Sequence, residues 1–399
     1  MASLACPQGG LLRMPESVTS EEEATAAGLL AALVRIPSVN PRNKAGGAPP
    51  LGEARMAEFV ARYAEGLGAQ VEMDQVVPGR PNVYCTWGSG ELGLLLETHL
   101  DTVGVEGMEE PFGARVSGRR LRGRGACDAK GSLAAMLLAC GMACDRLDRG
   151  LMLAAVVDEE HGFRGAKALL QRKPQPGLVV VGEPTQLKPV TVTKGCVRFR
   201  VTVRGKGAHT CAGEAGTNAV VKACKVIGAL YDELAPRLRR KQHPLVGPAT
   251  LAVTIIRGGA EVNVVPAECT FHVDRRLVPG ETAQEALAEV ERLVAQLRER
   301  DQELEVLLEP PYLLDPALEQ SLDSPGVRSF LEACEKVLGE ATPTGVAFGT
   351  DASKFAQAGL AALVFGPGDV AQAHGAEEWV DLREVALAAR VYAEAALTV

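Results

Sequence analysis

The chain has 399 residues and a formal net charge of −8 at pH 7, and 47% of its residues are hydrophobic while only 4% are aromatic. This length supports a large core and favours two domains over one. The acidic balance without a basic patch argues against nucleic-acid binding, and no apolar run reaches the roughly 18 residues of a membrane span.

Cysteine usage and the N-terminal sequence predict a cytoplasmic protein. The ten cysteines are scattered and none forms a CxxC pair, which is typical of reduced, mostly buried thiols. Residues 1–20 lack the basic start and the continuous apolar core of a signal peptide.

The first half of the chain alternates predicted helices with apolar strands, the order of an α/β domain. Apolar spacing predicts helices over 20–35, where Ser20 can act as the cap, and over 52–67, 132–147 and 164–172. Strands are predicted over 71–77, 82–87, 92–96, 151–157 and 178–181. The last three are short unbroken apolar runs, which is typical of strands buried on both faces.

At about residue 190 the pattern changes, because residues 194–204 alternate apolar and polar side chains as a half-exposed antiparallel strand does. A strand–helix–strand–strand–helix–strand order follows, which resembles a ferredoxin-like module. Its predicted members are 194–204, 216–235, 250–257, 269–277, 281–300 and 303–309.

We therefore expect a discontinuous α/β domain of residues 1–189 and 310–399, with a mixed, mostly parallel sheet between helices. Residues 190–309 would form an inserted α+β domain. The returning chain carries a predicted strand at 361–365 and predicted helices at 322–338, 351–358 and 382–397.

Acidic and histidine side chains follow four of the apolar strands. They are His99 and Asp101 after 92–96, Asp158, Glu159 and Glu160 after 151–157, Glu183 after 178–181, and His374 after 361–365. Ligands bind at the carboxyl ends of strands in open α/β sheets, and adjacent carboxylates repel one another unless a cation neutralises them. Oxygen and imidazole ligands suit zinc, cobalt or manganese, so the sequence predicts a metal site at this edge.

The spacing of His99 and Asp101 has a physical reason, because residues i and i+2 of an extended chain face the same way. His99 can bind a metal through one ring nitrogen while Asp101 accepts a hydrogen bond from the other. Taken alone, the pair is more often an ordinary strand end. Asp128 lies in a glycine-flanked turn before a helix and can bridge two metals or cap the helix. We expect Lys130 to be solvated or in a structural ion pair.

The adjacent acids Glu159 and Glu160 point to opposite sides, which indicates a division of roles. One can bind metal while the other serves as a general base. Two metals roughly 3.5–4 Å apart can activate a water molecule and polarise a substrate carbonyl. Each motif singly is more often structural, but their joint occurrence at successive strand ends favours a hydrolytic site.

Several segments between about residues 90 and 380 carry a resemblance to a known family. They are THLD (98–101), GRGACDAKG (123–131), DEEHG (158–162), GEPT (182–185), GAHT (207–210), VNVVPAECTFHVDRR (262–276) and FGPGDVAQAH (365–374). In this order they resemble the dinuclear-zinc aminoacylase and carboxypeptidase family of metallopeptidases. That family includes acetylornithine deacetylase, succinyl-diaminopimelate desuccinylase and glutamate carboxypeptidase.

The resemblance implies two zinc ions and a ligand set. His99, Asp128 and Glu183 would hold one zinc, and Asp128, Glu160 and His374 the other. Glu159 would be the base that activates water and passes the proton to the leaving amine. Asp101 would be the hydrogen-bond partner of His99, and the peptide after Asp128 would be cis.

The resemblance also implies that residues 190–309 are a lid and dimerisation domain of a homodimer. His209 would reach the partner's active site and stabilise the oxyanion; without the resemblance it would be a surface histidine. Asn263 and Arg275 would bind the substrate carboxylate, because an Arg fork binds carboxylate bidentately. Arg276 is the alternative, because strand alternation lets only one of the two arginines face a site.

The predicted function is a zinc-dependent amidohydrolase that cleaves the amide of a small N-acyl amino acid or dipeptide. The segments 349–353 (GTDAS) and 365–374 favour the acetylornithine deacetylase branch, a step of arginine biosynthesis. The alternatives are succinyl-diaminopimelate desuccinylase, a dipeptidase or glutamate carboxypeptidase, and a mononuclear aminopeptidase-like site. An alternative of another class is a catalytically inactive metal-binding protein.

Overall fold

The computed structural model describes residues 17–42 and 51–399. The chain forms two compact units. The first unit comprises Met1–Pro189, Leu322–Pro343 and Leu363–Val399, and the second comprises Val190–Ser321 and Thr344–Ala362. Within the described ranges, no helix is long and apolar enough to cross a membrane. The sequence also predicts that residues 1–20 are not a signal peptide. Residues 1–16 of that segment lie outside the described ranges.

The sheet of the first unit is mixed, as the sequence predicts. Within the first unit, the strands of this sheet lie in the order β1-β2-β6-β3-β7-β20. Strand β2 pairs antiparallel with β1 and β6, whereas β3 pairs parallel with β6 and β7. The bounds are β1 Gln70–Val77, β2 Arg80–Trp87, β3 Leu92–His99, β6 Gly150–Val156, β7 Leu178–Gly182 and β20 Ala362–Phe365.

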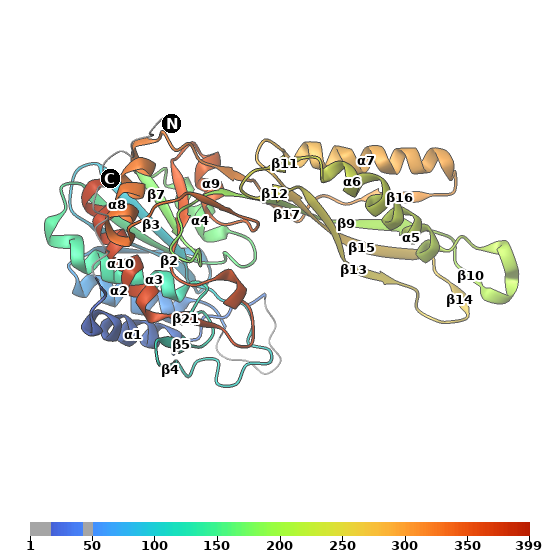
Figure 1. Ribbon diagram of the computed structural model, residues 1–399. Helices are drawn as coiled ribbons and strands as arrows, with labels where there is room; N and C mark the ends of the chain where they lie inside the picture. The colour runs from blue at the N-terminus through green and yellow to red at the C-terminus, as the bar shows by residue number, and fades with distance from the viewer. Residues whose placement is uncertain (1–16, 43–50) are drawn as a thin grey trace, which may run out of the picture. The chain divides into compact units, whose positions relative to one another are not determined.

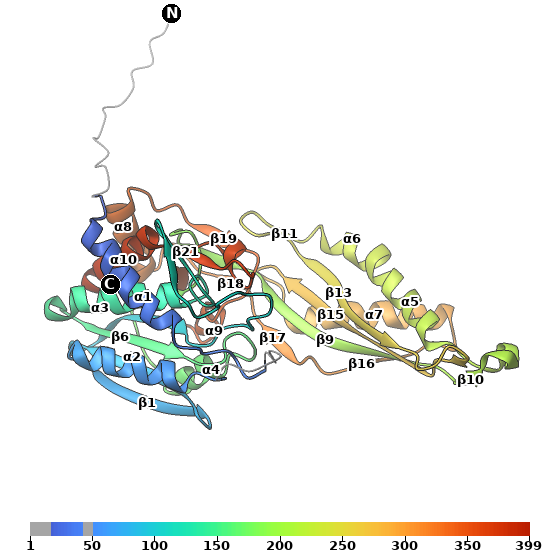
Figure 2. The ribbon, with the colours of Figure 1, turned by 90° about the horizontal axis from the view of Figure 1, so that it is seen from below.

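Helices cover both faces of this sheet (Figures 1 and 2). Helices α1, α3, α8 and α10 pack together on one face, and α2 and α4 pack on the other. Their bounds are α1 Ser20–Val34, α2 Ala54–Gly66, α3 Lys130–Ala143, α4 Arg164–Gln171, α8 Pro325–Leu338 and α10 Leu382–Thr398. A small antiparallel sheet beside them contains β4 Arg115–Ser117, β5 Arg120–Arg122 and β21 Trp379–Asp381.

Local chemistry explains where these elements begin. Helix α1 begins at Ser20 but is capped by Thr19, one residue before the predicted cap. The Thr19 hydroxyl accepts a hydrogen bond from the Glu22 N–H at 3.2 Å, and the Glu22 carboxylate accepts one from the Thr19 N–H at 2.8 Å. The apolar runs of β3, β6 and β7 are almost entirely buried, because helices cover both of their faces.

The second unit contains the predicted ferredoxin-like module. Its main sheet is antiparallel in the order β13-β15-β9-β16, with β17 also pairing with β9. Helices α5 and α7 cover one face (Figure 1), and the apolar side chains of that face form the core. The main elements are β9 Gly195–Arg204, α5 Ala219–Ala229, β13 Thr250–Gly258, β15 Glu268–Leu277, α7 Ala283–Arg300, β16 Glu305–Leu308 and β17 Leu313–Asp315.

Shorter elements complete the second unit. The strands are β8 Val190–Thr193, β10 Ala208–His209, β11 Gln242–His243, β12 Gly247–Pro248, β14 Val264–Val265, β18 Leu318–Glu319 and β19 Thr344–Val346. The helices are α6 Ala235–Leu238 and α9 Ala352–Gln357, and a π-helical turn spans Leu230–Leu234. Among the described residues, a 3-10 turn spans Thr210–Ala215 in this unit, and two more span Cys144–Arg146 and Val370–Gln372 in the first unit.

The second unit extends beyond residue 309, where the sequence predicted that the first domain resumes. Strand β17 returns along β9, and β18 pairs with β8, so the chain stays in this unit until Ser321. A later segment also belongs here, because the buried Lys354 ammonium lies 2.7 Å from the Asp315 carboxylate. The roles of the two units as catalytic domain and lid stay predictions.

Candidate metal centre

Parallel pairing brings the predicted strand ends of the first unit to one edge of its sheet. His99, the last residue of β3, is in register with Val156 of β6, just before the acids 158–160. Strand β7 lies on the other side of β3 and leads into Glu183. The carboxyl ends of parallel strands meet at the same edge, which is where open α/β sheets bind ligands.

Asp128 lies between the two predicted histidine ligands. Its Oδ1 atom is 3.0 Å from His99 Nε2, and its Oδ2 atom is 3.0 Å from His374 Nε2. The two oxygens of one carboxylate therefore face two imidazoles, as a residue shared by two metal positions requires.

The remaining predicted ligands lie on opposite sides of Asp128. Glu160 Oε1 is 3.2 Å from His374 Nε2, and Glu183 Oε1 is 3.9 Å from His99 Nε2. With Asp128 counted on both sides, each side has three residues. One side has His99, Asp128 and Glu183, and the other has Asp128, Glu160 and His374. The structure thus brings all five predicted ligands together, and its peptide after Asp128 is cis, as the resemblance implies.

The donor atoms fit a metal ion. Among the described residues, His99, Asp128 and Glu160 form one group whose ligand atoms lie within 4.8 Å of one another. His99, Glu159 and Glu183 form a second such group. Imidazole nitrogen with carboxylate oxygen is a donor set that zinc accepts. Because Glu159 also lies within reach, the division of roles between Glu159 and Glu160 stays a prediction.

The electrostatics of the cluster favour positive charge. Burial opposes the charged form of His99, but the hydrogen bond to Asp128 and the nearby Glu183 outweigh it and raise its pKa well above the usual range. Hydrogen bonds to Asp128 and Glu160 raise the pKa of His374 to about 10. Burial raises the pKa of Glu160. The same carboxylates that stabilise protonated imidazoles would stabilise a bound cation.

The Asp101 carboxylate has a different main contact from the one predicted. The nearest acceptor to His99 Nδ1 is the main-chain oxygen of Asp101 at 2.9 Å, while the carboxylate Oδ1 is 3.8 Å away. The carboxylate instead accepts the main-chain N–H groups of Glu159 at 3.1 Å and Glu160 at 3.2 Å. Asp101 therefore orients both His99, through its main chain, and the acidic turn, through its side chain.

Asn40 supports the same turn and was not found from the sequence. This fully buried side chain donates to Asp101 Oδ2 at 2.8 Å and to Asp158 Oδ1 at 3.0 Å. Asp158 is also fully buried, and Arg164 and Arg80 pair with it. Asp158 is therefore a structural acid, and no local pattern around Asn40 indicates this role.

Lys130 is buried and forms no ion pair with any residue that the structure describes, so the prediction that it is solvated or ion-paired is wrong. Its side chain is buried, and its Nζ donates to the main-chain oxygen of Ile36 at 2.8 Å. Burial lowers the pKa of this ammonium to about 7. The side chain packs under the turn that carries Asp128, where the lysine stem fills space beside Gly125.

The second unit holds the other predicted site residues. His209 is exposed on β10, and its Nδ1 accepts the Cys211 N–H at 3.3 Å. The main-chain oxygen of Asn263 accepts the Thr210 N–H at 3.0 Å, and His209 on β10 pairs with Val264, the residue after Asn263. Their roles toward substrate stay predictions.

The surroundings of Arg275 do not support a substrate-binding role. Its side chain is fully buried and pairs with Glu281 at 2.6 Å and Glu289 at 3.6 Å. Strand alternation turns Arg276 to the other face of β15, where it is half-buried and pairs with Asp274 at 2.7 Å. Arg275 lies on the face of β15 that helix α7 covers, and its guanidinium pairs with two carboxylates there.

The fold, with imidazoles and carboxylates clustered at the edge of a mixed α/β sheet, defines a class: the metal-dependent hydrolases. More particularly, the chain belongs to Peptidase family M20/M25/M40, whose model matches residues 95–398. It is a metallo-hydrolase that acts on amide bonds, and the resemblance stated from the motifs is confirmed.

Individual proteins are similar over most of the chain. Acetylornithine deacetylase from Myxococcus xanthus is 32% identical over 316 residues, which cover 77% of this chain and 80% of that relative. The M20 metallo-carboxypeptidase Sso-CP2 from Sulfolobus solfataricus superposes with a TM-score of 0.75 at 20% identity, covering 95% of this chain and 99% of the other. A Bacillus subtilis protein described as a dinuclear metal-binding M20 peptidase gives a TM-score of 0.69 at 16% identity, covering 95% and 98%. These likenesses confirm the predicted fold class.

Proposed function

We propose that this enzyme is a di-zinc deacylase that removes the acetyl group from N-acetylornithine. The observation that carries the metal centre is Asp128, whose two oxygens each face a histidine. The observation that favours this substrate is the likeness to the Myxococcus xanthus deacetylase. The products would be acetate and ornithine, because hydrolysis of the amide places the hydroxyl on the acyl carbon and the proton on the amine.

The distances above support the assignment of the residues that would hold the metals. Asp128 would be shared, with His99 and Glu183 on one side and Glu160 and His374 on the other. Bound zinc supplies Lewis-acid polarisation and lowers the pKa of water. Cobalt or manganese would fit the same donors.

Glu159 would act as the general base and then as the general acid. Its carboxylate would take the proton from the attacking water and pass it to the leaving nitrogen, so no other acid is needed. The main-chain N–H of Glu159 is fixed by Asp101, which Asn40 holds in turn. This fixed turn would limit the movement of the base during proton transfer.

The remaining roles are proposals that rest on the family resemblance. His209 from the partner subunit of a homodimer would stabilise the oxyanion, and Asn263 would bind the substrate carboxylate. Arg276 takes the place of Arg275 in this proposal, because Arg275 is buried against two carboxylates. The proposal also includes a cytoplasmic location for the enzyme and a role for its reaction as a step in arginine biosynthesis.

The test compares substrates on the zinc-loaded protein. We expect N-acetylornithine to be hydrolysed with a kcat/KM at least ten times that for N-succinyl-diaminopimelate or a dipeptide. Glu159→Ala should abolish hydrolysis while zinc content is retained, and Glu58→Ala, at an exposed position of α2, should change nothing. A large preference for the succinyl substrate would overturn the substrate assignment in favour of the desuccinylase.

Metal stoichiometry distinguishes the di-zinc deacylase from a mononuclear enzyme and from an inactive metal-binding protein. Full activity with one metal per chain would support a mononuclear site. Two bound metals without hydrolysis of any substrate would support an inactive metal-binding protein. We expect two metals per chain together with hydrolysis.

A further inference from the structure

Glu378 is a buried carboxylate to which the proposed chemistry assigns no task. It follows His374 by four residues and is 1% exposed. Its Oε1 atom accepts the main-chain N–H of Cys127 at 2.9 Å and that of Asp128 at 3.1 Å. One carboxylate oxygen therefore holds the main chain at the residue that both metal positions would share.

The other oxygen holds the start of the same turn. Oε2 of Glu378 accepts the Gly125 N–H at 3.0 Å and the Arg124 guanidinium at 2.6 Å. Arg124 is itself buried and balances the charge. Taking a carboxylate out of water is costly unless donors replace the lost hydration. Four donors therefore surround the Glu378 carboxylate: the N–H groups of Gly125, Cys127 and Asp128, and the Arg124 guanidinium. We call this arrangement the Glu378 cage.

The cage fixes a turn that has little other freedom. A Cβ atom at Gly125 would lie 2.9 Å from atoms of Lys130 and Thr102, so the main chain is closely packed there. Glu378 accepts hydrogen bonds from the main-chain N–H groups of Gly125, Cys127 and Asp128. Close packing and these hydrogen bonds together hold the turn just before Asp128, whose carboxylate faces two histidines.

Glu378 also joins the two segments that supply ligands. Asp128 stands at the end of the 123–128 turn, and His374 stands on the segment that continues into Glu378. These segments are far apart in the sequence, and the Glu378 hydrogen bonds connect main chain to side chain across that separation. Glu378 thereby ties the main chain at Asp128 to the segment of His374, whose Nε2 lies 3.0 Å from Asp128 Oδ2.

We propose that Glu378 is a positioning residue that sets the spacing of Asp128 and His374, and thereby the affinity of the metal position these two residues share. The inference rests on the metal centre of the proposed function but not on its substrate. Hydrogen-bond partners of metal ligands typically contribute about 10–100-fold to metal affinity. We expect a loss in this range when the cage is broken.

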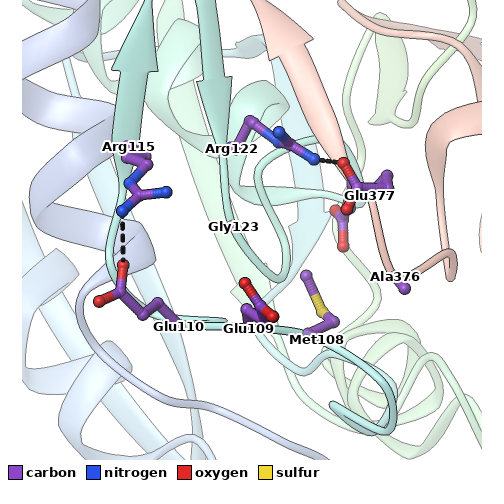
Figure 3. Close-up of a pocket in the computed structure, with 9 residues that line it drawn as sticks. Met108, Glu109, Glu110, Arg115, Arg122, Gly123, Ala376 and Glu377 are labelled. Atoms are coloured by element: carbon purple, nitrogen blue, oxygen red, sulfur yellow. Dashed lines mark ion pairs between the residues drawn. The ribbon is translucent and has the colours of Figure 1, made fainter.

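The neighbouring residue provides a matched control. Glu377 is largely exposed and pairs with Arg122, and both line a cavity of about 90 Å³ (Figure 3). Glu378 lines the same cavity. Glu377→Gln and Glu378→Gln make the same chemical change at adjacent positions. In Glu378→Gln the amide NH₂ must replace one acceptor oxygen, so two of the four donors lose their acceptor.

The experiment is a zinc titration of the metal-free protein against a competing chelator, without substrate. Glu378→Gln should weaken zinc binding at one of two positions by 10–100-fold, and Glu377→Gln should bind within twofold of wild type. Thermal unfolding of the metal-free proteins shows whether a weaker site reflects only lost folding. Unchanged zinc affinity at both positions in a folded Glu378→Gln protein would overturn the proposal.

Two further measurements keep the proposal testable if Glu378→Gln does not fold. Glu378→Asp keeps the charge beside Arg124 but withdraws the oxygens by one methylene, and it should also weaken one zinc position. In the wild-type protein, hydrogen exchange at the Cys127 and Asp128 amides should be slow, because Glu378 accepts both. Fast exchange there would contradict the cage. Failure to hydrolyse N-acetylornithine would sink the substrate proposal while leaving these zinc measurements valid.

Discussion

Replacing Asn40 with leucine tests how the acidic turn is held. The two side chains have nearly the same shape, but leucine donates no hydrogen bond, so Asp101 and Asp158 each lose a buried donor. A hydrogen bond to a charged group contributes about 1.5–3 kcal/mol. Asp101 keeps two main-chain donors and Asp158 keeps Arg164, so we expect the lower end for each, about 3 kcal/mol in total.

The loss should appear in both stability and turnover. Urea unfolding of the metal-free protein measures the free energy of unfolding, and steady-state hydrolysis measures kcat and KM. Because the turn carries Glu159, we expect kcat to fall by about tenfold or more, the effect of losing a partner of a catalytic centre, with KM nearly unchanged. Gln296→Leu, at an exposed position of α7, serves as the control and should change the unfolding free energy by less than about 0.5 kcal/mol.

Two results would refute this reasoning. An unfolding free energy within about 1 kcal/mol of wild type would mean that the two carboxylates do not depend on Asn40. A large loss of stability with an unchanged kcat would mean that Asn40 supports the fold but not the position of Glu159.

Three other perturbations have expected outcomes. The Arg390 hydrogen bond lowers the pKa of Glu22 from 4.5 to about 2, so its stabilisation is present above pH 4.5 and is lost as the pH falls toward 2. Glu22→Gln should therefore lower the free energy of unfolding by about 1–2 kcal/mol at pH 7, after allowance for solvent screening, and by little at pH 2. Equal losses at both pH values in urea unfolding would contradict this. Lys354→Met leaves Asp315 buried without its cation and should destabilise the protein by about 3–5 kcal/mol in the same assay, whereas a neutral effect would refute the pairing. Removing metal with a chelator should abolish hydrolysis and lower Tm, because free zinc at 100 times its Kd stabilises the folded protein by about 3 kcal/mol. Added zinc should restore both hydrolysis and Tm. Activity that survives chelation would exclude a metal requirement.

Much of the candidate metal centre could be predicted from the sequence. Short apolar runs bounded by glycine and acids define buried parallel strands, and the chain must leave such strands at the carboxyl edge of the sheet. His99, the 158–160 acids and Glu183 follow from that rule. His374 and Asp128 were also candidates from the sequence, but neither directly ends a strand, so the resemblance was needed to assign them to particular metal positions.

The choice between the two arginines of β15 shows a limit of local patterns. Strand alternation determines that Arg275 and Arg276 face opposite sides, but the period of two cannot say which side is covered. The covering helix α7 supplies Glu289, and the turn before it supplies Glu281, so Arg275 is paired and buried. Only packing of the helix on the sheet decided this.

The sequence by itself determined the fold class, the family and the ligand types, because periodicity, strand ends and contiguous motifs are local properties of the chain. The tertiary structure alone decided what supports the ligands. Glu378 contacts the turn before Asp128, and Asn40 contacts Asp101 and Asp158, across long stretches of sequence. The burial of Lys130 arose in the same way, because its acceptor is the distant Ile36 carbonyl. A buried polar group takes whichever partner the completed fold brings to it, and no local pattern records that partner in advance.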